Sequence, residues 1–163
     1  MARIVATAGQ VRTGWRHLRR RTTPEAMEQR ADACVEGHRI LVVDDNRMVR
    51  EGLVTLLEKR GFSARGVGNG REALQTLREG FDACLILLDL TMPIMDGWTF
   101  RKAQQADPRL AAIPVVVLAA LTDAEKAAEK MGATAGLAKP LDVDRVVTLV
   151  ADHCPRTLRV RAR

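Results

Sequence analysis

The sequence predicts an α/β fold, a doubly wound five-stranded parallel sheet in the order 2-1-3-4-5 with helices on both faces. Short apolar segments alternate with segments whose apolar residues recur at helical spacing. Five of each kind follow one another in strict alternation from about residue 39, which is typical of parallel strands joined by crossover helices. Three of the strand segments are apolar throughout, as strands buried on both faces are.

The predicted elements are defined by these two patterns. The strand segments are short and mostly apolar, and the second is weaker than the others. They span residues 40–43, 62–67, 83–88, 113–118 and 134–138. The helical segments carry apolar residues three and four positions apart. They span residues 46–60, 70–79, 98–106, a segment that begins at Thr122, and 143–152.

The ends of the helical segments carry start and stop signals. The third ends before Pro108, where a helix cannot easily continue. Thr122 lies three residues before Glu125, the spacing of a capping box, so we expect Thr122 to cap the fourth helix. Asp142 is the expected N-cap of the last helix, which ends before Pro155.

The net charge of +6 comes from the two ends of the chain. Residues 1–37 hold seven Arg against four acids, and residues 151–163 hold four Arg against one acid. Residues 38–150 hold fifteen basic and fifteen acidic side chains, so the central part has an ordinary globular surface. No apolar run approaches the roughly 20 residues that cross a bilayer, and no membrane insertion is expected.

This charge distribution divides the chain into three parts. We expect a basic N-terminal extension at 1–37, a globular domain at 38–153 and a basic C-terminal tail at 154–163. The extension is expected to be partly disordered. A helix at 24–36, with Pro24 in its first turn, is the alternative for part of it.

The three cysteines, Cys34, Cys84 and Cys154, do not have the spacing of a metal site. Cys84 lies in an apolar run and is interpreted as a small buried hydrophobic residue. Acidic residues follow the basic start, so there is no apolar segment for export. The sequence therefore predicts a reduced protein in the cytoplasm.

Charged residues follow three of the predicted strands directly. Asp44 and Asp45 follow the first, Asp89 ends the third, and Lys139 precedes Pro140 after the fifth. The carboxyl ends of parallel strands meet at one edge of the sheet, so we expect these groups to converge. Three carboxylates repel one another, and a hard cation such as Mg²⁺ relieves that repulsion. The set favours phosphoryl transfer to Asp89.

Four segments, in this order at the strand ends, resemble the receiver domain of bacterial response regulators, the phosphoacceptor half of two-component signalling. They are ILVVDDN (40–46), LILLDLTMPIMDG (85–97), IPVVVLAA (113–120) and GATAGLAKP (132–140). The resemblance covers about residues 38–153 and implies the flavodoxin-like sheet that the periodicity also predicts. The resemblance implies a phosphoprotein that catalyses only its own phosphorylation and dephosphorylation. It does not imply an enzyme with a diffusible substrate.

The resemblance also assigns roles to individual residues. Asp89 would accept a phosphoryl group from a histidine kinase or a histidine phosphotransfer protein in a phosphorelay. The Mg²⁺ ligands would be Asp44, Asp45, Asp89 and the backbone carbonyl of Thr91. Lys139 would pair with the phosphoryl oxygens, and the family's bond before Pro140 is typically cis.

Two positions depart from the family pattern. Where the family usually has Thr or Ser at the end of the fourth strand, this chain has Ala119, which carries no hydroxyl. Where the family usually has Tyr or Phe in the fifth strand, this chain has Gly136. These positions form the family's conformational relay, so we predict smaller changes on phosphorylation around both strands. The nearby hydroxyl of Thr122 is expected to be engaged as the N-cap.

The sequence supports a single-domain response regulator that signals through protein contacts or serves as a phosphate sink. The main alternative is a receiver-like binding or adaptor module that works without phosphorylation. A nucleic-acid-associated protein is a third hypothesis, but no recognition helix or aromatic platform accompanies the basic ends. The kinase, the downstream target and the choice between monomer and homodimer stay open.

Overall fold

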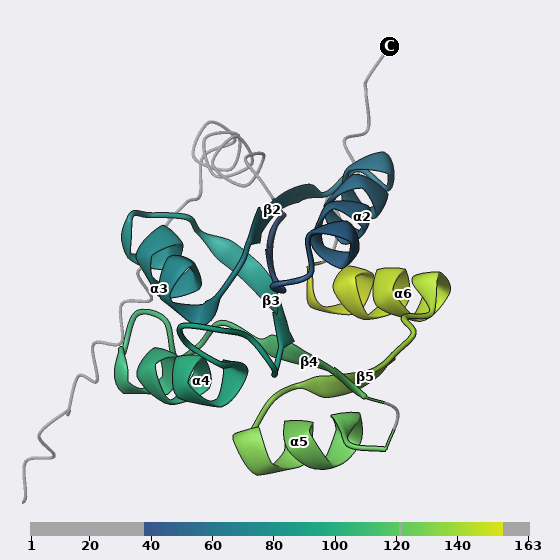
Figure 1. The fold of residues 1–163 in the computed structure, drawn as a ribbon. Coiled ribbons are helices and arrows are strands. Elements are labelled where there is room, and N and C mark those ends of the chain that lie inside the picture. The colour runs from purple at the N-terminus through teal and green to yellow at the C-terminus, as the bar shows by residue number, and fades with distance from the viewer. Residues whose placement is uncertain (1–37, 121, 155–163) are drawn as a thin grey trace, which may run out of the picture. The chain divides into compact units, whose positions relative to one another are not determined.

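The computed structural model describes residues 38–120 and 122–154, in which five parallel strands form one sheet (Figure 1). The strand order is β2-β1-β3-β4-β5, as predicted. The strands are β1 (Arg39–Val43), β2 (Ser63–Val67), β3 (Ala83–Asp89), β4 (Val115–Ala120) and β5 (Ala135–Lys139). The helices are α2 (Arg47–Lys59), α3 (Gly70–Arg78), α4 (Gly97–Ala106), α5 (Ala124–Met131) and α6 (Val143–His153). The predicted extension at 1–37, its helix at 24–36 and residues 155–163 lie outside the described residues.

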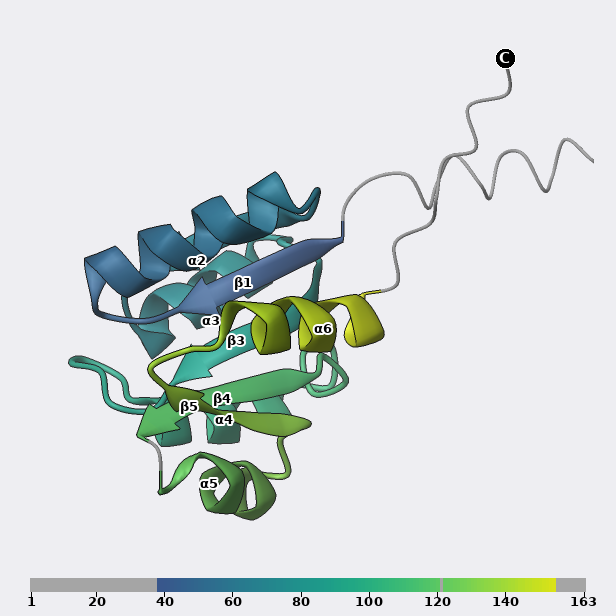
Figure 2. The same ribbon diagram turned by 90° about the vertical axis from the view of Figure 1, so that its right-hand side faces the viewer.

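Helices cover both faces of the sheet (Figures 1 and 2). Successive residues of a strand point to opposite faces, so the continuously apolar strands supply two cores. Leu41 and Val43 of β1 contribute to the core beneath α3, α4 and α5, whereas Ile40 and Val42 contribute to the core beneath α2 and α6. The double burial explains why these strands read as apolar runs rather than as alternating patterns.

Strand β4 begins two residues later than predicted. Ile113 donates its backbone N–H to the carbonyl oxygen of Leu110 at 3.0 Å, which closes a turn. Pro114 has no N–H to offer a neighbouring strand, so ladder pairing begins at Val115. The strand also ends two residues later than predicted, at Ala120, so Ala119 lies within it.

The predicted N-cap of α5 was wrong. The helix begins at Ala124 with Asp123 in the N-cap position, and the Asp123 side chain makes no capping hydrogen bond. Asp123 instead donates its backbone N–H to the carbonyl oxygen of Ala120 at 3.0 Å, which tightens the turn that carries Thr122. The capping-box spacing of Thr122 and Glu125 therefore falls on a turn, and the N-cap lies one residue later than predicted.

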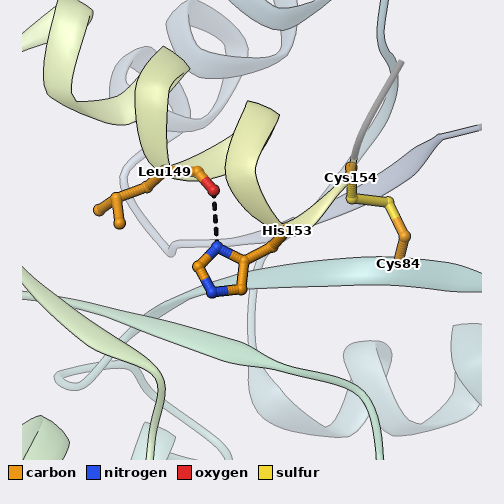
Figure 3. Close-up of a disulfide and its surroundings, with 4 residues drawn as sticks. All are labelled: Cys84, Leu149, His153 and Cys154. Carbon is orange, nitrogen blue, oxygen red and sulfur yellow. Dashed lines mark hydrogen bonds between the residues drawn. A yellow bond between two sulfur atoms is a disulfide. The ribbon is translucent and has the colours of Figure 1, made fainter. Parts of the chain in front are cut away.

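The prediction that the cysteines are reduced was also wrong for two of the three residues. Cys84 and Cys154 form a disulfide between β3 and the end of α6, across 70 positions of sequence (Figure 3). Cys34 lies outside the described residues. Among the helices of the described part, none is long and apolar enough to cross a membrane.

Candidate functional site

Four residues singled out from the sequence meet at the carboxyl-terminal edge of the sheet: Asp44, Asp45, Asp89 and Lys139. One oxygen from each of the three carboxylates lies within 4.8 Å of the other two. Lys139 Nζ donates to Asp89 Oδ1 at 2.8 Å and to Asp44 Oδ2 at 2.9 Å. The bond between Lys139 and Pro140 is cis, as the resemblance implied. The strand order has thus gathered groups that lie up to 95 positions apart in the sequence.

Burial sets the charge balance of this cluster. Asp44 is fully buried and Asp89 is 6% exposed, whereas Asp45 is exposed. Burial raises the pKa of Asp89, Lys139 lowers it in part, and the charges of Asp44 and Asp45 raise it further, so the net shift is upward. Burial disfavours the charged form of Lys139 and by itself lowers its pKa. The hydrogen bonds of Lys139 to Asp89 and Asp44 outweigh that effect, so the pKa of Lys139 is raised. The ammonium is therefore held in its charged form between two carboxylates.

The three carboxylates fit a hard divalent cation. They form an all-oxygen donor set, which Mg²⁺ prefers. Oxygen ligands of one Mg²⁺ lie up to about 4 Å apart, close to the 4.8 Å spread of this cluster. One lysine offsets one of three negative charges, so a cation would relieve the repulsion that remains.

An open cavity of about 510 Å³ gives access to the cluster. Its wall includes the predicted acceptor Asp89 and two further predicted ligand positions, Asp45 and Thr91. Lys139 and Ala119 also line it. Ala119 contributes only a methyl group, which leaves room beside Asp89. The cavity wall also includes Asp123, which the sequence reasoning had not connected with the site.

The backbone around the first two acids is held by Arg50, which the sequence reasoning missed. Arg50 Nη1 donates to the carbonyl oxygen of Asp44 at 2.6 Å and to that of Asp45 at 3.3 Å. Asn46 donates its N–H to Asp44 Oδ1 at 2.8 Å, and its own side chain caps α2. In the sequence, Arg50 looks like any basic residue on a helix surface, so no pattern distinguished it.

The Asp-Gly pair after β3 brings α4 close to the acceptor strand. Asp96 Oδ1 caps α4 by accepting from the N–H of Thr99 at 2.7 Å, and these hydrogen bonds lower the pKa of Asp96. Gly97 donates its N–H to the carbonyl oxygen of Leu90 at 3.0 Å. A Cβ at position 97 would lie 2.9 Å from the Cα of Leu90, so a glycine is required for this close approach.

Gly136 allows α5 to pack directly on the backbone of β5. A Cβ at this position would collide with the carbonyl group of Ala124 and lie 2.8 Å from the backbone nitrogen of Glu125. The first turn of α5 therefore occupies the space into which a side chain at position 136 would extend. The sequence shows that no side chain extends from position 136, but it does not indicate that a helix occupies that space.

The other end of α5 is held by Arg101 of α4, a second residue that the sequence reasoning missed. Arg101 is 8% exposed, and its guanidinium donates to the carbonyl oxygens of Met131 at 3.2 Å and Gly132 at 2.7 Å. The third nitrogen donates to Gln104 Oε1 at 2.6 Å. Helix α5 is thus fixed at its first turn by Gly136 and at its last by Arg101.

The loop between β3 and α4 carries a strained residue, Ile94, with φ of 71°. A β-branched residue rarely adopts this conformation, whereas glycine adopts it freely. We expect Ile94→Gly to raise the free energy of unfolding by up to about 1 kcal/mol in urea titrations. Ile94→Val keeps the branched side chain and should show no gain. A glycine variant less stable than the valine variant would contradict the assigned strain.

The raised pKa of Asp89 makes stability depend on pH in the metal-free protein. A carboxyl whose pKa is raised on folding favours the fold in its protonated form, so its contribution is lost as pH rises above its ordinary value of 3.8. We expect Asp89→Asn, which keeps the neutral form, to gain stability relative to the wild type as pH rises from that value. Urea titrations in a chelator across this range measure the gain. The exposed Asp82→Asn is the control, and an equal gain there would contradict the assignment to Asp89.

Comparison with known proteins identifies relatives over most of the described chain. The family model for the response regulator receiver domain matches residues 40–151, which run from β1 into α6. A response regulator receiver protein of Anaeromyxobacter sp. is 38% identical over 113 residues, which cover 68% of this chain and 46% of that protein. The transcriptional regulatory protein GltR of Pseudomonas aeruginosa is 38% identical over 87 residues, covering 53% and 36%. The chain spans less than half the length of these two relatives.

Solved structures share the same architecture. A response regulator receiver protein from Pseudomonas putida superposes with a TM-score of 0.65 at 33% identity, covering 70% of this chain and 95% of that one. The chemotaxis protein CheY4 of Vibrio cholerae superposes with a TM-score of 0.66 at 27% identity, covering 72% and 98%. The likeness therefore extends over nearly the whole of these two solved structures.

Proposed function

The chain belongs to the family of response regulator receiver domains, and we propose that its Asp89 accepts a phosphoryl group in a Mg²⁺-dependent reaction. The receiver domain in this proposal is residues 38–153, flanked by the basic segments 1–37 and 154–163. The observation that carries it is the pair of hydrogen bonds from Lys139 to Asp44 and Asp89 at the open edge of the sheet.

The reaction follows from the placement of these groups. A carboxylate oxygen of Asp89 attacks the phosphorus of a phosphohistidine, the new O–P bond forms as the P–N bond breaks, and the histidine nitrogen keeps the electron pair and takes up a proton. Lys139 Nζ, 2.8 Å from Asp89 Oδ1, offsets the charge that arrives on the phosphoryl oxygens. Asp44, Asp45 and Asp89, with the backbone carbonyl of Thr91, would hold Mg²⁺, which supplies further charge neutralisation.

The donor in this proposal is a histidine kinase or a histidine phosphotransfer protein. An apolar groove of about 420 Å³ is lined by residues of α2 and of the segment after β5, and Lys139 is among its lining residues. Met48 and Val143 line it, and they are 85% and 46% exposed. A donor helix lying in this groove would present its phosphohistidine beside Lys139, and hence beside Asp89. We propose a cytoplasmic location, the compartment in which such a donor acts.

Incubation with a small acyl phosphate and Mg²⁺, followed by intact-mass measurement, tests the proposed chemistry without a partner protein. We expect one phosphoryl group on the wild type, none on Asp89→Asn, and none on the wild type in the presence of a chelator. The matched control Asp82→Asn removes an exposed carboxylate near the start of β3 and should label normally. An unlabelled wild type, under conditions that label an ordinary receiver, would refute the proposed function.

The packing around α5 affects how far phosphorylation of Asp89 can change the structure of α5 and β5. We propose that it causes little movement of α5 and β5, because Ala119 offers it no hydroxyl and Gly136 is covered by α5. A carrier or phosphate sink needs the acceptor but not that movement. Amide NMR spectra with and without a phosphoryl mimic and Mg²⁺ should show shifts near Asp89 and few in α5 and β5. Large shifts throughout α5 would contradict this prediction.

One observation also favours the alternative of an adaptor that works without phosphorylation. The contacts of Arg101 and Gly136 with α5 do not involve Asp89, so the position of α5 in this proposal does not depend on the acceptor. An Asp89→Asn protein that kept full function in cells would support the adaptor. Loss of function in that variant, together with normal folding, would support the phosphoacceptor.

A further inference from the structure

We propose that Cys84 and Cys154 form a reversible thiol–disulfide site that ties the last turn of α6 to β3. The two residues are joined by a disulfide, and their Cα atoms are 6.0 Å apart, within the range that a disulfide spans (Figure 3). Cys84 is the second residue of β3, and Cys154 is the residue that closes α6. The fold itself therefore brings together two thiols from distant parts of the chain.

The disulfide is remote from the proposed acceptor. Cys84 and Asp89 lie near opposite ends of the same strand, about 16 Å apart at the rise of an extended chain. Because of this separation, we expect oxidation or reduction of the pair to leave the carboxylates and Lys139 in place. The redox site is thus a separate property of the molecule and does not rest on the proposed phosphoryl transfer.

The two cysteine residues differ in their exposure, and this difference gives the exchange a direction. Cys154 is 1% exposed and packs in the core beneath α6, whereas Cys84 is only partly buried. A small thiolate would reach the sulfur of Cys84 first and release Cys154 as the leaving thiolate. In the oxidising direction, the two thiols and one molecule of oxidised glutathione give the protein disulfide and two molecules of reduced glutathione. In a compartment that keeps thiols reduced, such exchange makes the bond transient.

The state of this pair determines how the end of α6 is held. Cys154 donates its backbone N–H to the carbonyl oxygen of Val150 at 2.8 Å, and the side chains of Cys154 and Val150 are buried. Oxidation adds a covalent link at this point, whereas reduction leaves the last turn with its helical hydrogen bonds and apolar contacts. We therefore infer that oxidation suppresses local opening of the last turn of α6.

Glutathione redox buffers test the site on the full chain, with Cys34→Ser as the background so that only the pair is counted. Free thiols are alkylated and counted by intact mass, and amide hydrogen exchange is measured in Val150 to Cys154. We expect both thiols to disappear together as the oxidised fraction of glutathione rises, with exchange about tenfold slower in the oxidised form. Cys84→Ser, at the more exposed position, should abolish this redox dependence without unfolding the protein.

Three results would contradict the proposal of a reversible disulfide. The pair could stay fully alkylatable in excess oxidised glutathione, which would mean that no bond forms. It could stay closed in excess reduced glutathione, which would make the bond permanent rather than reversible. It could instead take up glutathione at a single cysteine, which would mean that the two thiols do not act together.

Discussion

Replacement of Lys139 with methionine is expected to slow phosphoryl acceptance by about a hundredfold, the usual effect of removing one charge-stabilising donor. Lys139 Nζ is the shared hydrogen-bond donor to Asp89 and Asp44. Its loss leaves incoming phosphoryl oxygens without the ammonium and leaves two buried carboxylates without their partner. The rate of mass gain from an acyl phosphate at saturating Mg²⁺ measures the effect.

The same substitution is expected to lower the free energy of unfolding at pH 7 by about 2–3 kcal/mol in a chelator, since removing one partner of a buried pair leaves the other charge uncompensated. The raised pKa of Lys139 means that its contribution is fully present below its ordinary value of 10.5 and is lost as pH rises through the raised value. The free energy of unfolding of Lys139→Met should therefore stay below that of the wild type at neutral pH. The difference should become smaller in acid, as Asp89 takes up a proton.

Two matched variants separate charge from general disruption. Lys139→Arg keeps a positive charge but replaces a point charge with a planar fork, so we expect partial activity. Lys102→Met removes an exposed lysine from α4 and should change neither labelling nor stability. Labelling of Lys139→Met at the wild-type rate would exclude Lys139 from the proposed chemistry.

Replacement of Gly136 with alanine is expected to lower the free energy of unfolding by about 2–3 kcal/mol, at the upper end of the cost of overpacking. The new Cβ would meet backbone atoms of Ala124 and Glu125, which cannot rotate away as a side chain can. Helix α5 must shift as a whole, against the hydrogen bonds that Arg101 makes to its last turn. Gly136→Tyr should displace α5, with fast amide exchange in Ala124–Met131.

Gly52 provides a matched control for this substitution. It lies on the exposed face of α2, and a Cβ there would have no neighbour within 4 Å. Alanine is preferred over glycine in a helix, so Gly52→Ala should raise the free energy of unfolding by about 1 kcal/mol. The two glycine-to-alanine changes should therefore have opposite signs. Equal effects at both positions would show that the packing of α5 on β5 is looser than described.

Much of the fold could be predicted because its pattern is local. Residues 40–43 and 85–88 are apolar at every position since β1 and β3 are covered on both faces, and this alone implies parallel central strands. The convergence of Asp44, Asp89 and Lys139 followed from one rule, that the carboxyl ends of parallel strands share an edge. These inferences required no knowledge of which side chains touch.

The parts that could not be predicted depend on contacts between distant segments. Cys84 and Cys154 pair across 70 positions, and nothing near either residue marks its partner. Arg101 looks like a surface arginine until α4 and α5 are packed together. The start of α5 was misplaced because the spacing of Thr122 and Glu125 describes a local option, which the turn at Asp123 overrode. Tertiary packing, rather than propensity, decided each of these cases.

The packing at Gly136 also makes positions 119 and 136 unequal in what they can accept. Ala119 borders an open cavity, so a serine or threonine hydroxyl could be introduced there by a single substitution. An aromatic ring could be introduced at position 136 only after substitutions elsewhere had moved α5 outward, because the first turn of α5 lies against the Gly136 backbone. The order in which substitutions are made therefore matters at this face of the sheet, since a variant that receives the ring before α5 has moved would fold poorly.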